Sequence, residues 1–218
     1  MTKFSLLIFD LDDTLIHSNI DYGKMKERVK ALFEPNYVFE KNFPLKILLE
    51  KLAPDSQKFL EAHKIITEME AESSLIAEVI PVADTFPKFL AELKVKSAIL
   101  TNNSRRSVAK YLSIGKFNFL NKMGPIITRD DVSAMKPDPS GINYIINKFN
   151  LQDHKEEVLY IGDSSIDVDA TRQAGIRCIL VNYRDLDVST FNSQPWKIFS
   201  NLTEVINFLR REMIDCVY

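Results

Sequence analysis

The sequence predicts an α/β fold: a Rossmann-like core of three layers, with a parallel sheet between helices, and an all-helical domain inserted after the first strand. From residue 81 onward, short apolar runs alternate with helical patterns, and this alternation favours a parallel sheet that is covered on both faces. Residues 21–78 show helical periodicity only. We therefore expect residues 1–16 and 82–218 to form the core, and residues 17–81 to form an inserted all-helical domain.

The predicted insert carries the signals of helices. It contains Gly23 and no other glycine, a composition that favours helix over strand. Pro44 can open a short helix, and Pro54 and Asp55 indicate a turn before a longer one. Apolar residues recur at helical spacing in two stretches, Tyr22, Met25, Val29 and Leu32, and then Phe59, Ala62, Ile66 and Met69.

The core elements follow one another in a regular order. The predicted strands are 4–9, 97–100, 125–127, 158–161 and 178–181, and the predicted helices are 84–93, 104–112, 140–149 and 165–174. A last amphipathic helix presents one apolar face made of Leu202, Val205, Ile206 and Leu209. In such sheets ligands bind beyond the carboxyl ends of the strands, so the residues that follow each strand are the candidates for a site.

The composition is that of an ordinary globular protein, with 45% hydrophobic and 27% charged residues. A net charge of −2 gives no electrostatic reason to expect nucleic acid or an anionic membrane as a partner. Cys178 and Cys216 lack the close spacing of a zinc site or a disulfide framework, which fits a reducing compartment. No basic leader and no apolar run of membrane length is present, so we expect a cytoplasmic location.

Asp10, Asp12 and Thr14 follow the first buried strand directly. Two carboxylates at one strand end repel each other and tend to protonate unless a cation offsets their charge. Hard oxygen ligands favour Mg²⁺ among the common cations. One carboxylate could then attack phosphorus while the other transfers protons. Alone, the same pattern could also be a capped turn.

Polar residues also follow two other predicted strands. The strand 97–100 leads into Thr101-Asn102-Asn103, and the strand 158–161 leads into Gly162-Asp163-Ser164-Ser165-Ile166-Asp167. Lys136 precedes Pro137 in a loop just before a helix. Because parallel strands end at one edge of the sheet, we expect a hydroxyl, an ammonium and several carboxylates to meet there.

These motifs resemble the four motifs of the haloacid dehalogenase-like hydrolase superfamily. Asp10-x-Asp12-x-Thr14 is similar to the first, Thr101 to the second, Lys136-Pro137 to the third, and Gly162-Asp163-x-x-x-Asp167 to the fourth. Their order and spacing span most of the chain. The helical insert after the first motif resembles the cap domain of the subgroup that contains phosphoglycolate phosphatases, in which the cap closes over the substrate.

The resemblance implies roles for five residues in catalysis. Asp10 would be the nucleophile that becomes phosphorylated. Asp12 would protonate the leaving group and then activate the water that hydrolyses the aspartyl phosphate. Thr101 and the backbone amide of Asn102 would bind phosphoryl oxygens, and Lys136 would neutralise charge on the nucleophile and on the phosphate.

The resemblance also implies a magnesium site. Mg²⁺ would be held by the carboxylate of Asp10, the backbone carbonyl of Asp12 and the carboxylate of Asp163. Asp167 would support the water shell of the metal. The implied cofactor is therefore Mg²⁺ and the implied partner a small phosphorylated metabolite.

The function predicted on this basis is Mg²⁺-dependent hydrolysis of a small-molecule phosphomonoester through an aspartyl phosphate. A phosphomutase of the same superfamily, a pyrophosphatase or nucleotidase, and a non-catalytic binding protein remain alternatives. A dehalogenase is disfavoured because relatives with that activity lack the acid at the position of Asp12. The sequence leaves open which phosphomonoester is bound, and whether the protein is a monomer or a homodimer.

Two neighbouring residues have simpler explanations. Asp13 stands where glycine is most common in this pattern, and we interpret it as a spacer because aspartate tolerates left-handed backbone geometry. His17 could touch substrate, but an exposed histidine in the linker to the insert is the favoured interpretation.

Overall fold

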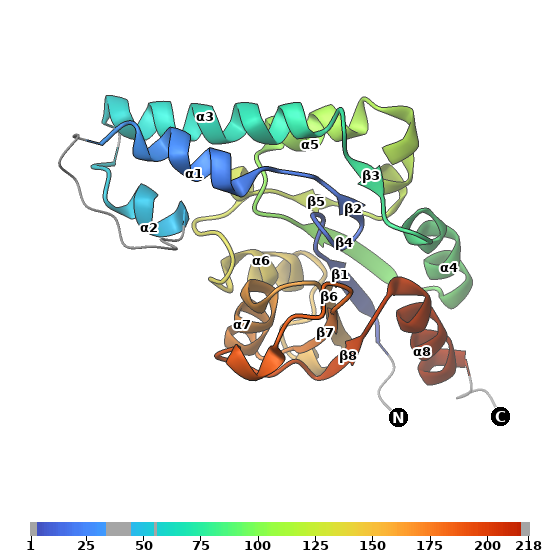
Figure 1. Ribbon diagram of the computed structural model, residues 1–218. Coiled ribbons are helices and arrows are strands. Elements are labelled where there is room, and N and C mark those ends of the chain that lie inside the picture. Colours follow the sequence, from blue (N-terminus) through green and yellow to red (C-terminus); the bar gives the residue numbers. More distant parts are fainter. Residues whose placement is uncertain (1–3, 34–44, 55, 215–218) are drawn as a thin grey trace. The chain divides into compact units, whose positions relative to one another are not determined.

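The computed structural model describes residues 4–33, 45–54 and 56–214, and the chain divides into two compact units. One unit is formed by Met1–His17 and Glu78–Tyr218, and the other by Ser18–Ala77 (Figure 1). The expected helix start at Pro44, the expected turn residue Asp55, and Cys216 lie outside the described residues.

The limits of the two units differ slightly from the predicted limits of 17–81 for the insert. The short strands β2 (Ile16–His17) and β3 (Glu78–Val79) pair in antiparallel fashion and belong to the larger unit. The residues directly before and directly after the insert therefore pair with each other, and this two-stranded ribbon is not part of the insert. Assignment of the smaller unit as a cap and of the larger one as a catalytic core remains a prediction.

The larger unit is built on a six-stranded sheet with the order β5-β4-β1-β6-β7-β8, and every neighbouring pair is parallel. Its strands are β1 (Leu6–Phe9), β4 (Lys96–Leu100), β5 (Ile126–Ile127), β6 (Val158–Gly162), β7 (Arg177–Val181) and β8 (Lys197–Phe199). The predicted parallel sheet is confirmed, and β8 is an additional edge strand. Phe9 is in register with Ile99 and Ile161, so β1, β4 and β6 end together at one edge.

Helices cover both faces of this sheet, as the fold class requires. They are α4 (Phe86–Leu93), α5 (Arg105–Leu112), α6 (Ser140–Lys148), α7 (Ser165–Ala174) and α8 (Leu202–Ile214), with short 3₁₀ helices η1 (Ala83–Thr85), η2 (Gly115–Lys122), η3 (Arg129–Asp131), η4 (Lys155–Glu157) and η5 (Val188–Thr190). In Figure 1, α6 and α7 lie on one side of the sheet and α4 and α8 on the other.

Alternate residues of the central strands point to opposite faces and bury two apolar layers. On one face the side chains pack against α6 and α7, and this layer includes Leu6, Ile8, Leu100, Val158, Tyr160, Leu180, Ile142, Ile145 and Val168. On the other face the ring of Phe9 packs edge-on against Phe86 of α4, with ring centroids 4.9 Å apart. Burial of such side chains contributes about 1.5–3 kcal/mol each, so the strands are held firmly where their ends meet.

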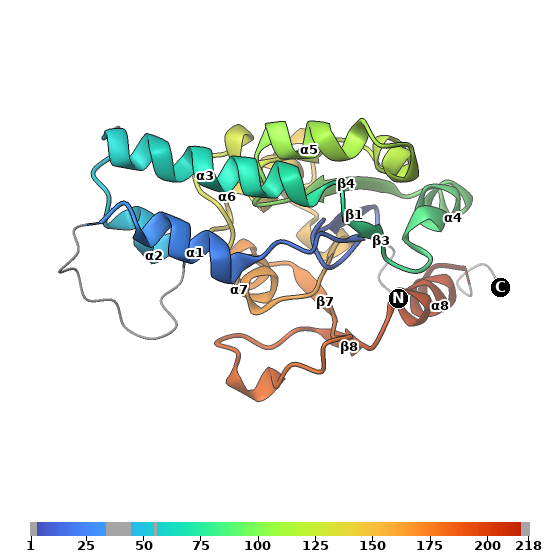
Figure 2. The same ribbon diagram turned by 45° about the horizontal axis from the view of Figure 1, so that its top comes forward.

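The regular elements described in the smaller unit are all helices. It contains α1 (Tyr22–Lys30), α2 (Leu45–Glu50) and α3 (Gln57–Ser73), and Figure 2 shows α1 running beside α3. Asp21 caps α1 by accepting a hydrogen bond from the backbone N–H of Lys24 at 2.8 Å, and Ser56 caps α3 through the N–H of Phe59 at 3.1 Å. Their apolar faces share one core of Met25, Val29, Leu48, Leu49, Leu52, Ala62, Ile66 and Met69.

No helix among the described residues has both the length and the apolar character needed to cross a membrane.

Candidate functional site

Asp10 extends the central strand by one residue into the edge where the predicted motifs meet. Its backbone N–H still donates to the carbonyl of Ile161 at 2.9 Å, so β6 fixes the direction in which the side chain leaves the sheet. The side chain is buried. After Asp10 the chain turns tightly: the N–H of Asp13 donates to the carbonyl of Ile16 at 2.6 Å, and Asp13 has a φ of 52°. Asp13 thus adopts the left-handed backbone geometry that aspartate tolerates.

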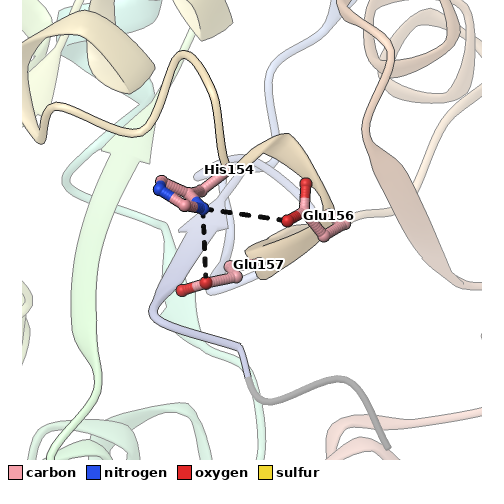
Figure 3. A group of neighbouring side chains, drawn as sticks. All are labelled: His154, Glu156 and Glu157. Carbon is pink, nitrogen blue, oxygen red and sulfur yellow. Dashed lines mark ion pairs between the residues drawn. The ribbon is translucent and has the colours of Figure 1, made fainter.

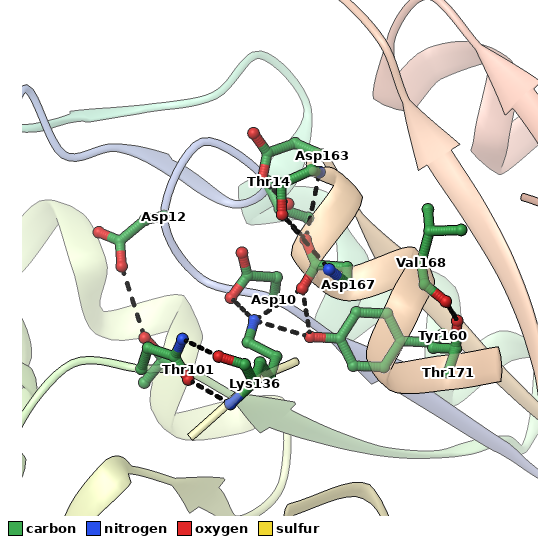
Figure 4. Close-up of polar contacts among 12 residues, drawn as sticks. Asp10, Asp12, Thr14, Thr101, Lys136, Tyr160, Asp163, Asp167, Val168 and Thr171 are labelled. Carbon is green, nitrogen blue, oxygen red and sulfur yellow. Dashed lines mark hydrogen bonds and ion pairs between the residues drawn. The ribbon is translucent and has the colours of Figure 1, made fainter. Parts of the chain in front are cut away.

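Lys136 reaches into the same edge and is almost fully buried. Its Nζ lies 2.6 Å from Oδ1 of Asp10, 2.7 Å from Oδ1 of Asp167 and 2.9 Å from the hydroxyl oxygen of Tyr160. An ammonium carries three protons, so these three acceptors match its hydrogen-bonding capacity in this arrangement. The buried charge of Lys136 is therefore balanced by two buried carboxylates (Figure 4).

Asp167 is positioned by the start of α7. The hydroxyl of Ser164 caps this helix and donates to Oδ2 of Asp167 at 2.6 Å, while the N–H of Asp167 donates back to that hydroxyl oxygen. Oδ1 of Asp167 accepts a hydrogen bond from the hydroxyl of Tyr160 at 3.0 Å. Gly162 is required for this close approach, because a Cβ at that position would lie 2.6 Å from Cγ of Asp167.

Asp12 lies on the side of the site formed by the loop after β4. Its Oδ2 accepts hydrogen bonds from Nδ2 of Asn103 at 2.7 Å and from the hydroxyl of Thr101 at 3.4 Å. Thr101 continues β4, since its N–H donates to the carbonyl of Ile127 at 2.9 Å. The two acids of the first motif thus face different neighbours, Asp10 toward Lys136 and Asp12 toward Thr101 (Figure 4).

Asp163 is the residue after β6, and it lies on the other side of Asp10 from Asp12 (Figure 4). Its Oδ1 lies 3.5 Å from the hydroxyl of Thr14, at the limit of a hydrogen bond. The guanidinium of Arg184, which follows β7, contacts the carboxylate of Asp163 through Nη2 and lies 3.4 Å from Oδ2 of Asp13 through Nη1. Arg184 is therefore a second cation of this edge, more exposed than Lys136.

Burial dominates the electrostatics of the acids. It raises the pKa of Asp10 well above its ordinary value, and the attraction of Lys136 offsets this only in part. It also raises the pKa of Asp163 to about 7, with the charge of Asp167 adding to the shift and Arg184 opposing it. Burial would raise the pKa of Asp167 as well, but the ammonium of Lys136 and three hydrogen bonds lower it below its usual range.

The described residues include one buried cluster of acids that could hold a cation. Each of Asp10, Asp163 and Asp167 offers one carboxylate oxygen, and these oxygens lie within 4.8 Å of one another. Asp10 and Asp163 have raised pKa values, and a nearby divalent cation would lower both. An all-oxygen donor set is the one that Mg²⁺ prefers. The cluster therefore fits the predicted cofactor.

A second group of potential ligands, His154, Glu156 and Glu157, lies at the surface (Figure 3). Nδ1 of His154 lies 3.8 Å from Oε1 of Glu156 and 3.7 Å from Oε1 of Glu157. The side chains of His154 and Glu156 are more than half exposed, and Glu157 also accepts a hydrogen bond from Ser5. Surface ion pairs account for this group, so we assign no metal site to it.

The site also contains residues that the sequence patterns did not reveal. The patterns place Tyr160 in an apolar strand and Asn103 beside Thr101 without indicating a role for either, and they do not point to Arg184. His17, expected to be exposed, is half-buried: its Nδ1 lies 3.4 Å from Oδ1 of Asp13, and its ring packs edge-on against Tyr183. The side of the sheet on which Tyr160 lies could have been predicted, because the alternation of side chains along a strand directs it to the face covered by α7.

Comparison with known families identifies the chain. Residues 7–181 match the haloacid dehalogenase-like hydrolase family, which is most of the chain, so the protein belongs to this family. The resemblance inferred from the four motifs is confirmed, as is the predicted class of enzyme, a hydrolase.

Relatives of known name agree with this assignment, and a solved structure shares the fold. Phosphoglycolate phosphatase 1 of Pseudomonas aeruginosa is 30% identical over 193 residues, which cover 82% of this chain and 69% of the relative. Pyrophosphatase PpaX of Halalkalibacterium halodurans is 28% identical over 197 residues, covering 83% and 85%. The crystal structure of a hydrolase from Pseudomonas syringae is similar with a TM-score of 0.74 at 21% identity, covering 97% of this chain and 99% of the other. The predicted α/β Rossmann-like fold is thereby confirmed.

The close approach of Gly162 to Asp167 gives a first prediction. Gly162→Ala should lower the free energy of unfolding by about 1–3 kcal/mol, because the added methyl must displace the buried Asp167 side chain. Denaturant unfolding measures this loss. Gly115→Ala is the matched control, since a Cβ there meets nothing within 4 Å. Equal losses in the two variants would contradict the packing argument.

Proposed function

We propose that this protein is a phosphatase that hydrolyses a small-molecule phosphomonoester through a phosphorylated Asp10, with Mg²⁺ as its cofactor. The observation that carries the proposal is the environment of Asp10. Its carboxylate is buried at the end of the central strand and paired with Lys136, and the second acid of the motif, Asp12, lies beside it and accepts hydrogen bonds from Thr101 and Asn103. A nucleophile, an electrophilic stabiliser and a proton-transfer group thus meet in one place.

In the first step a carboxylate oxygen of Asp10 attacks phosphorus, and the bond from phosphorus to the ester oxygen breaks. Asp12 gives its proton to that leaving oxygen, so the alcohol departs neutral. The contacts of Asp12 with Asn103 and Thr101 hold its carboxyl group to one side of Asp10, where it can reach a group bound in front of the nucleophile.

In the second step water attacks the phosphorus of the aspartyl phosphate. Asp12, now ionised, accepts a proton from that water, and Asp10 leaves as a carboxylate. Orthophosphate is released and both acids return to their starting states. The same acid therefore serves both steps, which requires that it remain close to Asp10 throughout.

Charge on the phosphoryl oxygens must be stabilised in both steps, and this is most of what phosphoryl transfer asks of a protein. In the proposal the Lys136 ammonium, the Thr101 hydroxyl and the backbone N–H of Asn102 supply that stabilisation. Lys136 also offsets the repulsion between Asp10 and an anionic ester.

Mg²⁺ would be held by Asp10, the backbone carbonyl of Asp12 and Asp163, with Asp167 supporting its water shell. When bound, it supplies positive charge beside the nucleophile and the phosphoryl oxygens. Among these residues, Asp10, Asp163 and Asp167 are the buried acids whose oxygens lie near one another.

A pyrophosphatase is the second candidate, because one of the similar relatives carries that name. The chemistry at Asp10 would be the same, with phosphate in place of an alcohol as the leaving group. A phosphomutase would return the phosphoryl group to a second hydroxyl. Release of orthophosphate from a panel that includes phosphoglycolate, sugar phosphates, nucleoside monophosphates and pyrophosphate separates these activities.

The proposal predicts that turnover depends on Asp10 and on a divalent cation. Asp10→Asn should lower kcat at least about a thousandfold, because the amide is a poor nucleophile. Chelation of divalent cations should abolish turnover and added Mg²⁺ should restore it. Orthophosphate release over the substrate panel measures both effects.

Asp130→Asn is the matched control, since Asp130 lies in η3 and contacts the backbone N–H of Arg105 instead of the site. It should retain the parent activity. Hydrolysis by Asp10→Asn at the parent rate, or full activity of the protein in excess chelator, would refute the proposal.

Arg184 gives a separate prediction about the affinity for Mg²⁺. Its guanidinium and the cation would compete for the carboxylate of Asp163. Arg184→Gln should therefore tighten Mg²⁺ binding about fivefold, corresponding to ~1 kcal/mol for a partly exposed ion pair. Titration calorimetry at a pH well above 7, the approximate pKa of Asp163, measures the dissociation constant.

Arg177→Gln is the control for this prediction, because Arg177 packs over the rings of Phe4 and Trp196. Its Mg²⁺ affinity should equal that of the parent. Unchanged or weaker binding in Arg184→Gln would show that Arg184 does not compete with the cation.

A further inference from the structure

The backbone that carries Lys136 lies in an irregular segment. Residues 132–139 connect η3 to α6 and belong to neither helix nor strand. Asp10 and Thr101 are each fixed by a backbone hydrogen bond to a neighbouring strand. Lys136 lies in no strand and so is not fixed in this way. Yet the Lys136 ammonium is held within 2.6–2.7 Å of two carboxylates. Something outside regular secondary structure must fix the point from which its long side chain starts.

The side chain of Asn102 does this by bonding both backbone groups of Lys136. Oδ1 of Asn102 accepts from the N–H of Lys136 at 2.9 Å, and Nδ2 of Asn102 donates to the carbonyl of Lys136 at 3.0 Å. This pair of bonds imitates the pairing of a neighbouring strand, with a side-chain amide in place of a peptide group. Two bonds to one residue fix its orientation as well as its distance.

Asn102 is itself held firmly. Its carbonyl accepts from Nη1 of Arg129 at 2.9 Å, and the N–H of Arg129 donates to the carbonyl of Asn103 at 3.1 Å. The residue thus links the loop after β4, which carries Thr101, to the segment that carries Lys136.

We propose that Asn102 is a positioning residue that sets the Lys136 ammonium against Asp10, so that the loop after β4 and the segment 132–139 act as one phosphate-binding unit. The effect on turnover rests on the proposed function, whereas the effect on Lys136 does not. A lysine side chain has four rotatable bonds, so a shift of its backbone moves the ammonium unless other contacts correct it. Displacement of a reacting or stabilising group by about 1 Å can cost about a hundredfold in rate.

Gln173 provides a matched control. Its Nε2 donates to the carbonyl of Pro137 at 2.7 Å, so a second side-chain amide bonds the same segment one residue further on. Gln173 is exposed, and its Nε2 also lies 3.3 Å from the carbonyl oxygen of Asp169 in its own helix. If Asn102 only tethered the segment, loss of either amide should have similar consequences.

The test compares Asn102→Ala with Gln173→Ala by two independent measurements. The first is the rate at which acetic anhydride acylates Lys136, followed by peptide mass spectrometry in the absence of substrate. The parent Lys136 is buried and ion-paired, so it should react slowly. Asn102→Ala should increase the rate at least about fivefold as the ammonium leaves its acceptors, and Gln173→Ala should change it by less than about twofold.

In the second measurement, kcat and KM are determined separately on a phosphomonoester that the parent protein hydrolyses. Asn102→Ala should lower kcat about 10- to 100-fold, whereas Gln173→Ala should stay close to the parent. If Asn102→Ala does not fold, Asn102→Asp takes its place. This variant keeps the side-chain shape and the acceptor for the Lys136 N–H but loses the donor to the Lys136 carbonyl, so changes in the same directions are expected.

The outcomes separate this inference from the proposed function. Increased acylation in Asn102→Ala without turnover of any phosphomonoester by the parent would support the positioning of Lys136 and overturn the phosphatase proposal. Unchanged acylation in Asn102→Ala, or an equal increase in Gln173→Ala, would overturn the positioning role even in an active phosphatase.

Discussion

The arrangement of the site depends on one buried cation. Lys136 bonds Asp10 from the central strand and Asp167 from α7, and the hydroxyl of Tyr160 contacts both Lys136 and Asp167. Charges of this kind are costly to bury unless they are paired and hydrogen-bonded. The ammonium therefore allows two carboxylates to share a buried edge of the sheet, and it connects elements that are far apart in the chain.

This constraint divides the site into two flanks around Asp10. On one flank Asp12 is held by Asn103 and lies near Thr101, which suits a group that exchanges protons with the leaving oxygen and with water. On the other flank lies Asp163, whose pKa is raised mainly by burial and further by the charge of Asp167. In the proposed function, Asp163 on that flank would hold the cation and Asp12 on the other would transfer protons, so the two roles would use different carboxylates.

The sequence was sufficient to predict the parallel sheet, the helical character of the insert and the acids at the strand ends, because strand alternation and the common edge of parallel strands determine where such residues emerge. It could not reveal Arg184, which depends on the path of the loop after β7. Nor could it reveal that the side chain of Asn102 bonds Lys136, since the direction of a loop side chain follows no periodicity. The edge strand β8 could not be predicted because it has only three residues, too few to show an alternating pattern, and all three are at least partly exposed.

A double-mutant cycle on the free energy of unfolding tests the central claim most directly. Lys136→Met and Asp167→Asn each remove one partner of the buried ion pair, and the double variant removes both. If Lys136 balances the buried carboxylates, the two losses are non-additive, with an interaction energy of about 1–3 kcal/mol. Losses that add to within about 0.5 kcal/mol would show that the two groups do not depend on each other, which would contradict the account.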